Sequence, residues 1–87
     1  MISKATGRFW KLYNELPASV QELAVKNYRL WRGNTRHPSL DFKKLGGRGD
    51  RFSVRIGDHY RAIGRKIEDG VEWVWIGTHE GYNNLVG

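Results

Sequence analysis

The spacing of apolar residues near the start of the chain predicts a first helix over about residues 7–15. Thr6 stands just before it, where a hydroxyl oxygen can accept from a free backbone N–H of the first turn. Pro17 ends this helix, because the residue before a proline avoids the helical basin. The positions expected to face the core are Phe9, Leu12, Tyr13 and Leu16.

A second helix is predicted to begin at Pro17, whose fixed backbone angle suits a first helical turn. One of its faces is largely apolar, and Gly33-Asn34 is a stop signal. The residues on that face are Val20, Leu23, Ala24, Asn27, Tyr28 and Trp31. The two helices, joined at a tight corner, are expected to form a helical hairpin.

The apolar period then changes to two, which is typical of strands. We predict an edge strand over residues 40–45 and three further strands over residues 51–56, 60–66 and 71–78. Gly57-Asp58 is expected to form the turn between the strands 51–56 and 60–66. The tail, 79–86, is long enough for one turn of helix. We therefore expect one domain, residues 1–87, of the α+β class: a helical hairpin packed on a three- to four-stranded antiparallel sheet.

The amino-acid composition indicates how this domain builds its core and in which cellular compartment we expect it. Only 39% of the residues are hydrophobic, but eleven are aromatic, so a few large side chains can build the core. There is no cysteine, which excludes disulfides and thiolate metal sites and fits a reducing cytoplasm. No run of apolar residues has the length of a signal peptide or a membrane span, so we expect a cytoplasmic protein without a membrane partner.

Positive charge is concentrated in the middle of the chain. Residues 26–66 hold twelve Lys and Arg against three Asp, a net charge of +9, whereas the flanks together carry −3. A segment of this kind favours a polyanion such as RNA, although a solubilising surface is the alternative. Eight of the twelve are Arg, which suits planar contacts to phosphates and bases. We assign RNA binding to Lys43, Lys44, Arg48 and Arg51.

The sequence lacks a phosphate-binding glycine loop, an HExxH motif and histidines at ligand spacing, so we expect neither a cofactor nor a metal. Arg55 and Arg61 are placed to be neighbours across a hairpin, with His79 and Tyr82 at the end of the last strand. Cleavage of RNA by its 2′-OH needs such cations and proton-transfer groups. The structural alternatives are a surface cation for Arg61, a strand-end residue for His79 and core packing for Tyr82.

Two strand motifs carry a family resemblance: Ser53-Val54-Arg55-Ile56 and His59-Tyr60-Arg61-Ala62. The Lys43-Lys44-Leu45 element and the Trp75-Ile76-Gly77-Thr78-His79 ending occur in the matching order. Together they resemble the RelE/ParE superfamily of bacterial toxins from type II toxin–antitoxin modules, over nearly the whole chain. The resemblance implies an α+β fold like that of microbial ribonucleases and a cognate antitoxin as partner.

In the RelE branch, the resemblance implies entry into the ribosomal A site and cleavage of mRNA without a metal. Arg61 then matches the phosphate-binding arginine, and Arg55 matches a basic position near the scissile bond. His79 lies near a C-terminal position that holds Arg or His, and Tyr82 near an aromatic residue that stacks on a base. We therefore expect Arg61, Arg55, His79 and Tyr82 to be catalytic, with mRNA and the ribosome as partners.

Two alternatives to an mRNA endonuclease stay open. The ParE branch shares the fold but inhibits DNA gyrase by protein binding, and a basic RNA-binding module would have no toxicity. Ser53 stands where the RelE type has Lys, and the tail reads THEGY in place of a run of basic residues or a His-Tyr pair. His79 together with Arg55 and Arg61 favours the endonuclease, because a gyrase inhibitor needs no proton-transfer group.

Overall fold

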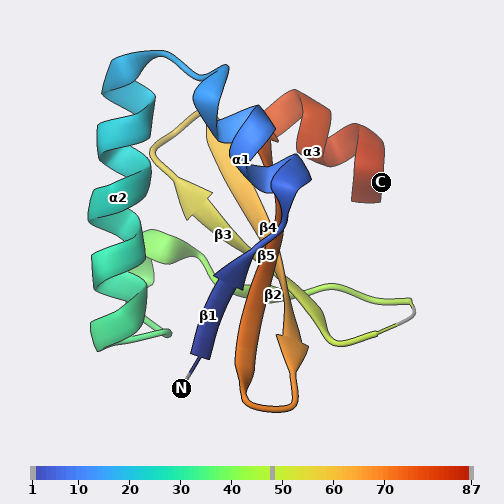
Figure 1. Cartoon of the computed structure of the whole chain (residues 1–87). Coiled ribbons are helices and arrows are strands. Elements are labelled where there is room, and N and C mark those ends of the chain that lie inside the picture. Colours follow the sequence, from blue (N-terminus) through green and yellow to red (C-terminus); the bar gives the residue numbers. More distant parts are fainter. Residues whose placement is uncertain (1, 48, 87) are drawn as a thin grey trace.

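The computed structural model describes residues 2–47 and 49–86, which form a five-stranded sheet flanked by helices (Figure 1). In chain order the elements are β1 (Ile2–Ala5), α1 (Gly7–Asn14), α2 (Ala18–Gly33), the 3-10 helix η1 (Pro38–Leu40), β2 (Lys43–Lys44), β3 (Arg51–Ile56), β4 (Tyr60–Ile67), β5 (Gly70–Thr78) and α3 (His79–Val86). The strand order is β1-β5-β4-β3-β2. The α+β class, with a pair of helices ahead of the main sheet, is confirmed.

The two N-terminal helices begin where the sequence predicts. The Thr6 hydroxyl accepts from the Phe9 backbone N–H at 3.1 Å, which caps α1. Pro17 is the cap residue of α2, so the proline both ends one helix and precedes the next. The Gln21 side-chain amide donates to the Tyr13 carbonyl at 3.0 Å and fastens the corner between the helices.

The core between these helices and the sheet is largely aromatic. The Trp31 ring of α2 stacks on Phe52 of β3, with ring centroids 6.3 Å apart and planes 4° apart. Trp73 of β5 meets Trp31 edge-on at 5.3 Å. Gly64 of β4 lies beneath these rings, where an added Cβ would stand 2.7 Å from Phe52 Cζ. A few large rings thus form the centre of this core, as the aromatic content predicts.

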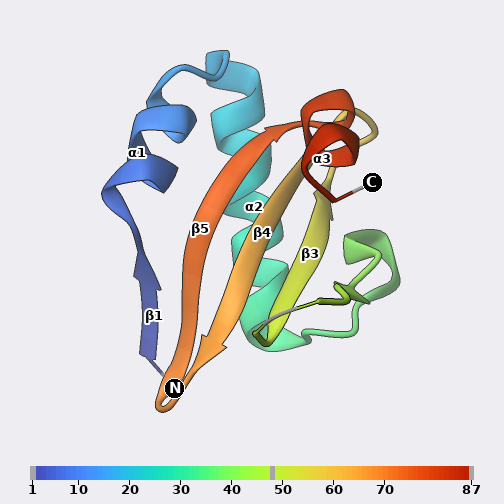
Figure 2. The ribbon, with the colours of Figure 1, turned by 90° about the vertical axis from the view of Figure 1, so that its right-hand side faces the viewer.

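The prediction of three or four antiparallel strands missed β1. This strand lies parallel to β5 at the edge of the sheet, and Ile2 pairs with Gly70 (Figure 2). The other neighbouring strands pair in antiparallel fashion. Four residues with one strongly apolar side chain give too weak a pattern to predict a strand. Strand β1 is instead held by β5, which is distant in the sequence: the backbones pair, and Trp73 Nε1 donates to Ser3 Oγ at 3.3 Å.

The predicted edge strand over residues 40–45 is wrong for its first half. Pro38 begins the 3-10 helix η1, and Leu40 is fully buried in it. Asp41 then adopts a left-handed conformation with φ 44°, which extended strands do not use. Only Lys43 and Lys44 pair with β3. The tail has the predicted bounds, but all eight of its residues form the helix α3 where the sequence predicts a single turn.

The two faces of the sheet differ in character. Phe52 and Val54 of β3 point into the core beneath the helices, so the intervening Ser53 points to the opposite face. Helix α3 packs on that opposite face, against β4 and β5 (Figure 2). Among the described helices, none combines the length and apolarity that a membrane span requires.

Candidate functional site

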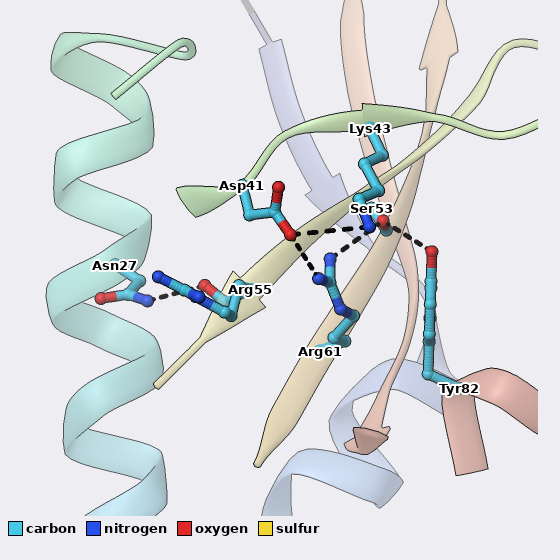
Figure 3. A network of polar contacts seen from close by, with 7 residues as sticks. All are labelled: Asn27, Asp41, Lys43, Ser53, Arg55, Arg61 and Tyr82. Carbon is cyan, nitrogen blue, oxygen red and sulfur yellow. Dashed lines mark hydrogen bonds and ion pairs between the residues drawn. The ribbon is translucent and has the colours of Figure 1, made fainter. Parts of the chain in front are cut away.

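Arg61 of β4 is at the centre of a polar network on the α3 side of the sheet (Figure 3). Its side chain is almost fully buried, with 5% of the residue exposed. Arg61 Nη2 donates to Asp41 Oδ2 at 2.6 Å, and Nη1 makes a long contact of 3.4 Å to Ser53 Oγ. The guanidinium carbon lies 5.1 Å from the centroid of the Tyr82 ring. Arg61 is therefore not a solubilising surface cation.

Asp41 is the counter-ion of this arginine. It follows η1 directly, and its left-handed backbone is one that Asp tolerates better than most residues. The hydrogen bond from Arg61 lowers the pKa of the Asp41 carboxyl, and the charges of Lys43 and Arg55 act in the same direction, whereas partial burial opposes them. Lys43 Nζ lies 3.7 Å from the same carboxylate oxygen. Asp41 thus stays ionised at neutral pH.

Tyr82 and His79 reach the network from α3. Tyr82 is buried, which agrees with the packing alternative, and its hydroxyl lies 2.9 Å from Ser53 Oγ. The exposed His79 ring stacks on the Tyr82 ring at 6.1 Å, and the His79 backbone N–H donates to the His59 carbonyl at 2.7 Å. Tyr82 therefore connects the buried arginine to an imidazole that is open to solvent.

Arg55 stands directly across from Arg61 in the β3–β4 register, as the hairpin predicts. Two cations in opposed positions repel each other, and Asp41 lies close enough to offset that repulsion. The backbone of Arg55 is fixed from the helix side: Asn27 of α2 donates to its carbonyl at 2.8 Å. Asn27 is buried, so this bond anchors the end of β3 beside the site.

The network contains the groups that phosphodiester chemistry uses. Arg61 and Lys43 are two cations paired with one acid, the charge of Arg55 acts on the same acid, and His79 and Tyr82 are groups that can transfer a proton. Arginine presents its N–H groups in a fork that matches phosphate oxygens. Charge that develops on a scissile phosphate would be stabilised here, provided that the phosphate reaches the guanidinium now bound by Asp41.

The other predicted RNA-binding residues are not part of this network. Lys44 and Arg51 line a small hollow at the other end of β2 and β3, together with Asp50 and Lys66. Arg48 lies outside the described residues. Within residues 2–47 and 49–86, no three His, Asp or Glu side chains gather closely enough to hold a metal ion.

Sequence reasoning missed Asp41, Ser53 and Asn27 as members of the site. The signal for Asp41 was present, because it is the only acid between Lys26 and Lys44 in a strongly basic segment. Ser53 was visible as a departure from lysine, and here it bridges Arg61 and Tyr82. The sequence places Asn27 on the apolar helix face, and nothing in it indicates that the amide binds a strand.

The helix side of the sheet has an apolar cavity of about 250 Å³ between α1, α2 and β1. Its walls include Phe9, Tyr13 and Tyr28. Trp10 and Val25 also border it, and they are 51% and 39% exposed. Large apolar side chains that are both exposed and next to a hollow are typical of protein-binding surfaces.

Several solved structures with a similar fold are described as toxins. The isolated RelE toxin of E. coli shares 21% identity and a TM-score of 0.69, with 98% of this chain and 94% of that chain covered. The YoeB/ParE toxin from Agrobacterium tumefaciens shares 19% identity and a TM-score of 0.72, covering 91% and 99%. The RelB–RelE antitoxin–toxin complex from Methanococcus jannaschii shares 15% identity and a TM-score of 0.72, covering 97% and 99%.

At these identities the structures show a common fold. A search of the curated proteins finds no match to the sequence. Residues 18–84, however, match the family described as "ParE-like toxin domain", from the start of α2 into α3. Since this match spans most of the chain and the fold agrees with it, the chain belongs to the ParE-like toxin family of the RelE/ParE superfamily.

Proposed function

We propose that this toxin is a ribosome-dependent mRNA endonuclease of a type II toxin–antitoxin module. The observation that supports this most directly is the contact of Arg61 of β4 with Tyr82 of α3, which stacks on His79. Arg55 lies across from Arg61 in the β3–β4 register, on the same face of the sheet. The RNA 2′-OH would attack the adjacent phosphate, with the arginines stabilising the charge that develops. His79 and Tyr82 would transfer the protons.

A gyrase inhibitor of the ParE kind is the second candidate. The family description favours it, and so does the neutralisation of Arg61 by Asp41 in this structure. Inhibition by protein binding needs surface contacts but no proton transfer, so His79 and Tyr82 would then serve only to pack α3. The two candidates therefore differ in what they require of the buried network.

An antitoxin is the partner that we propose for either activity. The M. jannaschii relative was solved as an antitoxin–toxin complex, and the apolar cavity bordered by Trp10 and Val25 offers a site for an apolar helix or strand. Lys4 lines the same cavity, so an acidic partner segment is favoured. A small acidic protein from a neighbouring gene should co-purify with the chain when the two are expressed together. Trp10→Asp should abolish this co-purification.

The decisive experiment is to induce the chain in bacteria and to map mRNA ends during growth arrest. Arg61→Ala should lose roughly 10²–10³ in cleavage rate, since a cation on the scissile phosphate acts mainly in the transition state. Arg61→Lys should restore only part of it, because a point charge lacks the bidentate fork. Arg65→Ala is the matched control, because Arg65 lies on β4 in an exposed pair with Glu72 at 2.7 Å.

Circular dichroism must show that each variant is folded, because Arg61 is buried. Cleavage by Arg61→Ala at the parent rate would contradict the site. Growth arrest without new mRNA ends in the parent would contradict the endonuclease. Supercoiling assays with purified gyrase would then test the second candidate.

A further inference from the structure

The hydrogen bonds of Arg61 leave part of its guanidinium group without a good partner. Its Nε is buried and has no hydrogen-bond partner, and its contact to Ser53 is long, at 3.4 Å. Only Nη2 has a short bond, to a single oxygen of Asp41. A guanidinium usually binds an oxyanion through two parallel N–H groups, one to each oxygen. The unpartnered Nε therefore points to an anion that fits Arg61 better than Asp41 does.

The position of Asp41 allows its carboxylate to move away from Arg61. Its side chain is 40% exposed, whereas that of Arg61 is 6% exposed, so the acid covers the arginine from the solvent side. It lies in the segment between η1 and the two-residue strand β2, and its own φ of 44° lies outside the extended and right-handed helical regions. The carboxylate is also close to Lys43, an exposed residue that can follow it toward solvent.

We propose that Asp41 is an internal substitute for the substrate phosphate and that RNA binds by exchange, in which a phosphodiester displaces the Asp41 carboxylate from Arg61. This rests on the proposed function, because it assigns the displaced position to the scissile phosphate. The free toxin then has a neutralised anion site. Arg61 becomes available only to a ligand whose oxyanion outcompetes the carboxylate, so weakly bound anions are rejected.

The exchange makes a prediction that a structural role for Asp41 does not. If Asp41 only holds Arg61 in position, removing its charge should weaken anion binding. If Asp41 competes with the anion, removing its charge should strengthen binding. Asp41→Asn removes the charge with little change in shape. Asp41→Gly removes the side chain and suits the left-handed backbone at this position.

The experiment is a titration of the purified chain with inorganic phosphate, followed by calorimetry and by the NMR signal of the Arg61 Nε–H group. Asp41→Asn and Asp41→Gly should bind phosphate about tenfold to hundredfold more tightly than the parent, as expected for loss of a charge-assisted competing bond. The Arg61 signal should shift on binding. Adding Arg61→Ala to Asp41→Asn should remove the gain.

Glu72→Gln is the matched control, because it removes the same unit of charge from another paired acid on the sheet. Equal or weaker phosphate binding by both Asp41 variants would overturn the exchange. So would an equal gain in Glu72→Gln, or a gain that survives loss of Arg61. If the exchange is observed but neither the parent nor Asp41→Asn cleaves mRNA on ribosomes, the proposed endonuclease fails while the exchange stands.

Discussion

The two faces of the central sheet are built from the same strands but differ in chemistry. On the helix side, stacked and edge-on rings of Trp31, Phe52 and Trp73 form a buried apolar layer. On the α3 side, Arg61 is buried with hydrogen-bond partners that do not satisfy all its N–H groups. One face therefore contributes most of the apolar burial, and the other holds charge that burial disfavours. Alternation along β3 lets a single strand contribute to both.

The largest effect that tests this comparison is expected from Trp31→Ala. Trp31 is 3% exposed and touches the rings of both β3 and β5, so its loss should lower the free energy of unfolding by about 3–5 kcal/mol. Urea denaturation measures this. Trp10→Ala, which removes a half-exposed ring from α1, should cost much less. Equal losses would mean that the core is not concentrated beneath α2.

A smaller loss is expected from Gly64→Ala, which adds one methyl group to the helix-side layer. The new Cβ would meet Phe52 at 2.7 Å and Trp73 at 3.1 Å, and both rings are buried and cannot move aside freely. Overpacking of this kind costs about 1–3 kcal/mol. Gly46→Ala is a suitable control, because an added Cβ there meets no other atom within 4 Å. Thermal unfolding of both variants gives the comparison.

On the α3 side, Tyr82→Phe should lower the free energy of unfolding by only about 0.5–1.5 kcal/mol, the usual net value of one hydrogen bond. The variant loses the 2.9 Å contact between its hydroxyl and Ser53 but keeps the ring that packs on Arg61 and His79. Cleavage assays sharpen the result. A large loss of rate with this small loss of stability would place the hydroxyl in proton transfer, whereas an unchanged rate would leave it a packing role.

The smallest effect is a pH dependence from Asp41. Its folded pKa lies below the ordinary value of 3.8, so the unfolded chain takes up a proton first as the pH falls. The stabilisation by the Asp41–Arg61 pair is thus complete well above pH 3.8 and is lost as the pH drops below it. Parent and Asp41→Asn should differ in stability at neutral pH and converge in acid. A constant difference at all pH values would contradict this linkage.

Sequence reasoning reached most of the fold because most of its signals are local. Thr6 and Pro17 mark helix starts through their own chemistry, and the alternation in β3 and the turn at Gly57 are complete within a few residues. It failed where a local pattern depends on a distant partner. Strand β1 forms because its backbone pairs with the edge of β5. Leu40 is not extended, because it lies in the 3-10 helix that begins at Pro38 and its side chain is buried in the core.

The sequence predicts that Arg55 and Arg61 lie opposite each other, but it does not predict that Arg61 is already paired with Asp41. The Arg55–Arg61 pairing follows from strand register, which a short hairpin fixes. The bond between Asp41 and Arg61 does not, because a conformation outside the common backbone regions brings Asp41 to β4 across a gap of twenty positions in the chain. Whether a cation is free or already paired is a property of tertiary contacts, and no local spacing records it.

The parallel edge of the sheet bears on how the chain is made. The earliest strand, β1, finds its partner only at Gly70–Trp73, and α1 lies against that same strand, β5. During synthesis the N-terminal segment therefore cannot dock until β5 has been made, and such long-range closure is slow. Tyr82 comes later still. A nascent chain that stops before β5 therefore has neither the β1–β5 edge of the sheet nor the contact between Tyr82 and Arg61.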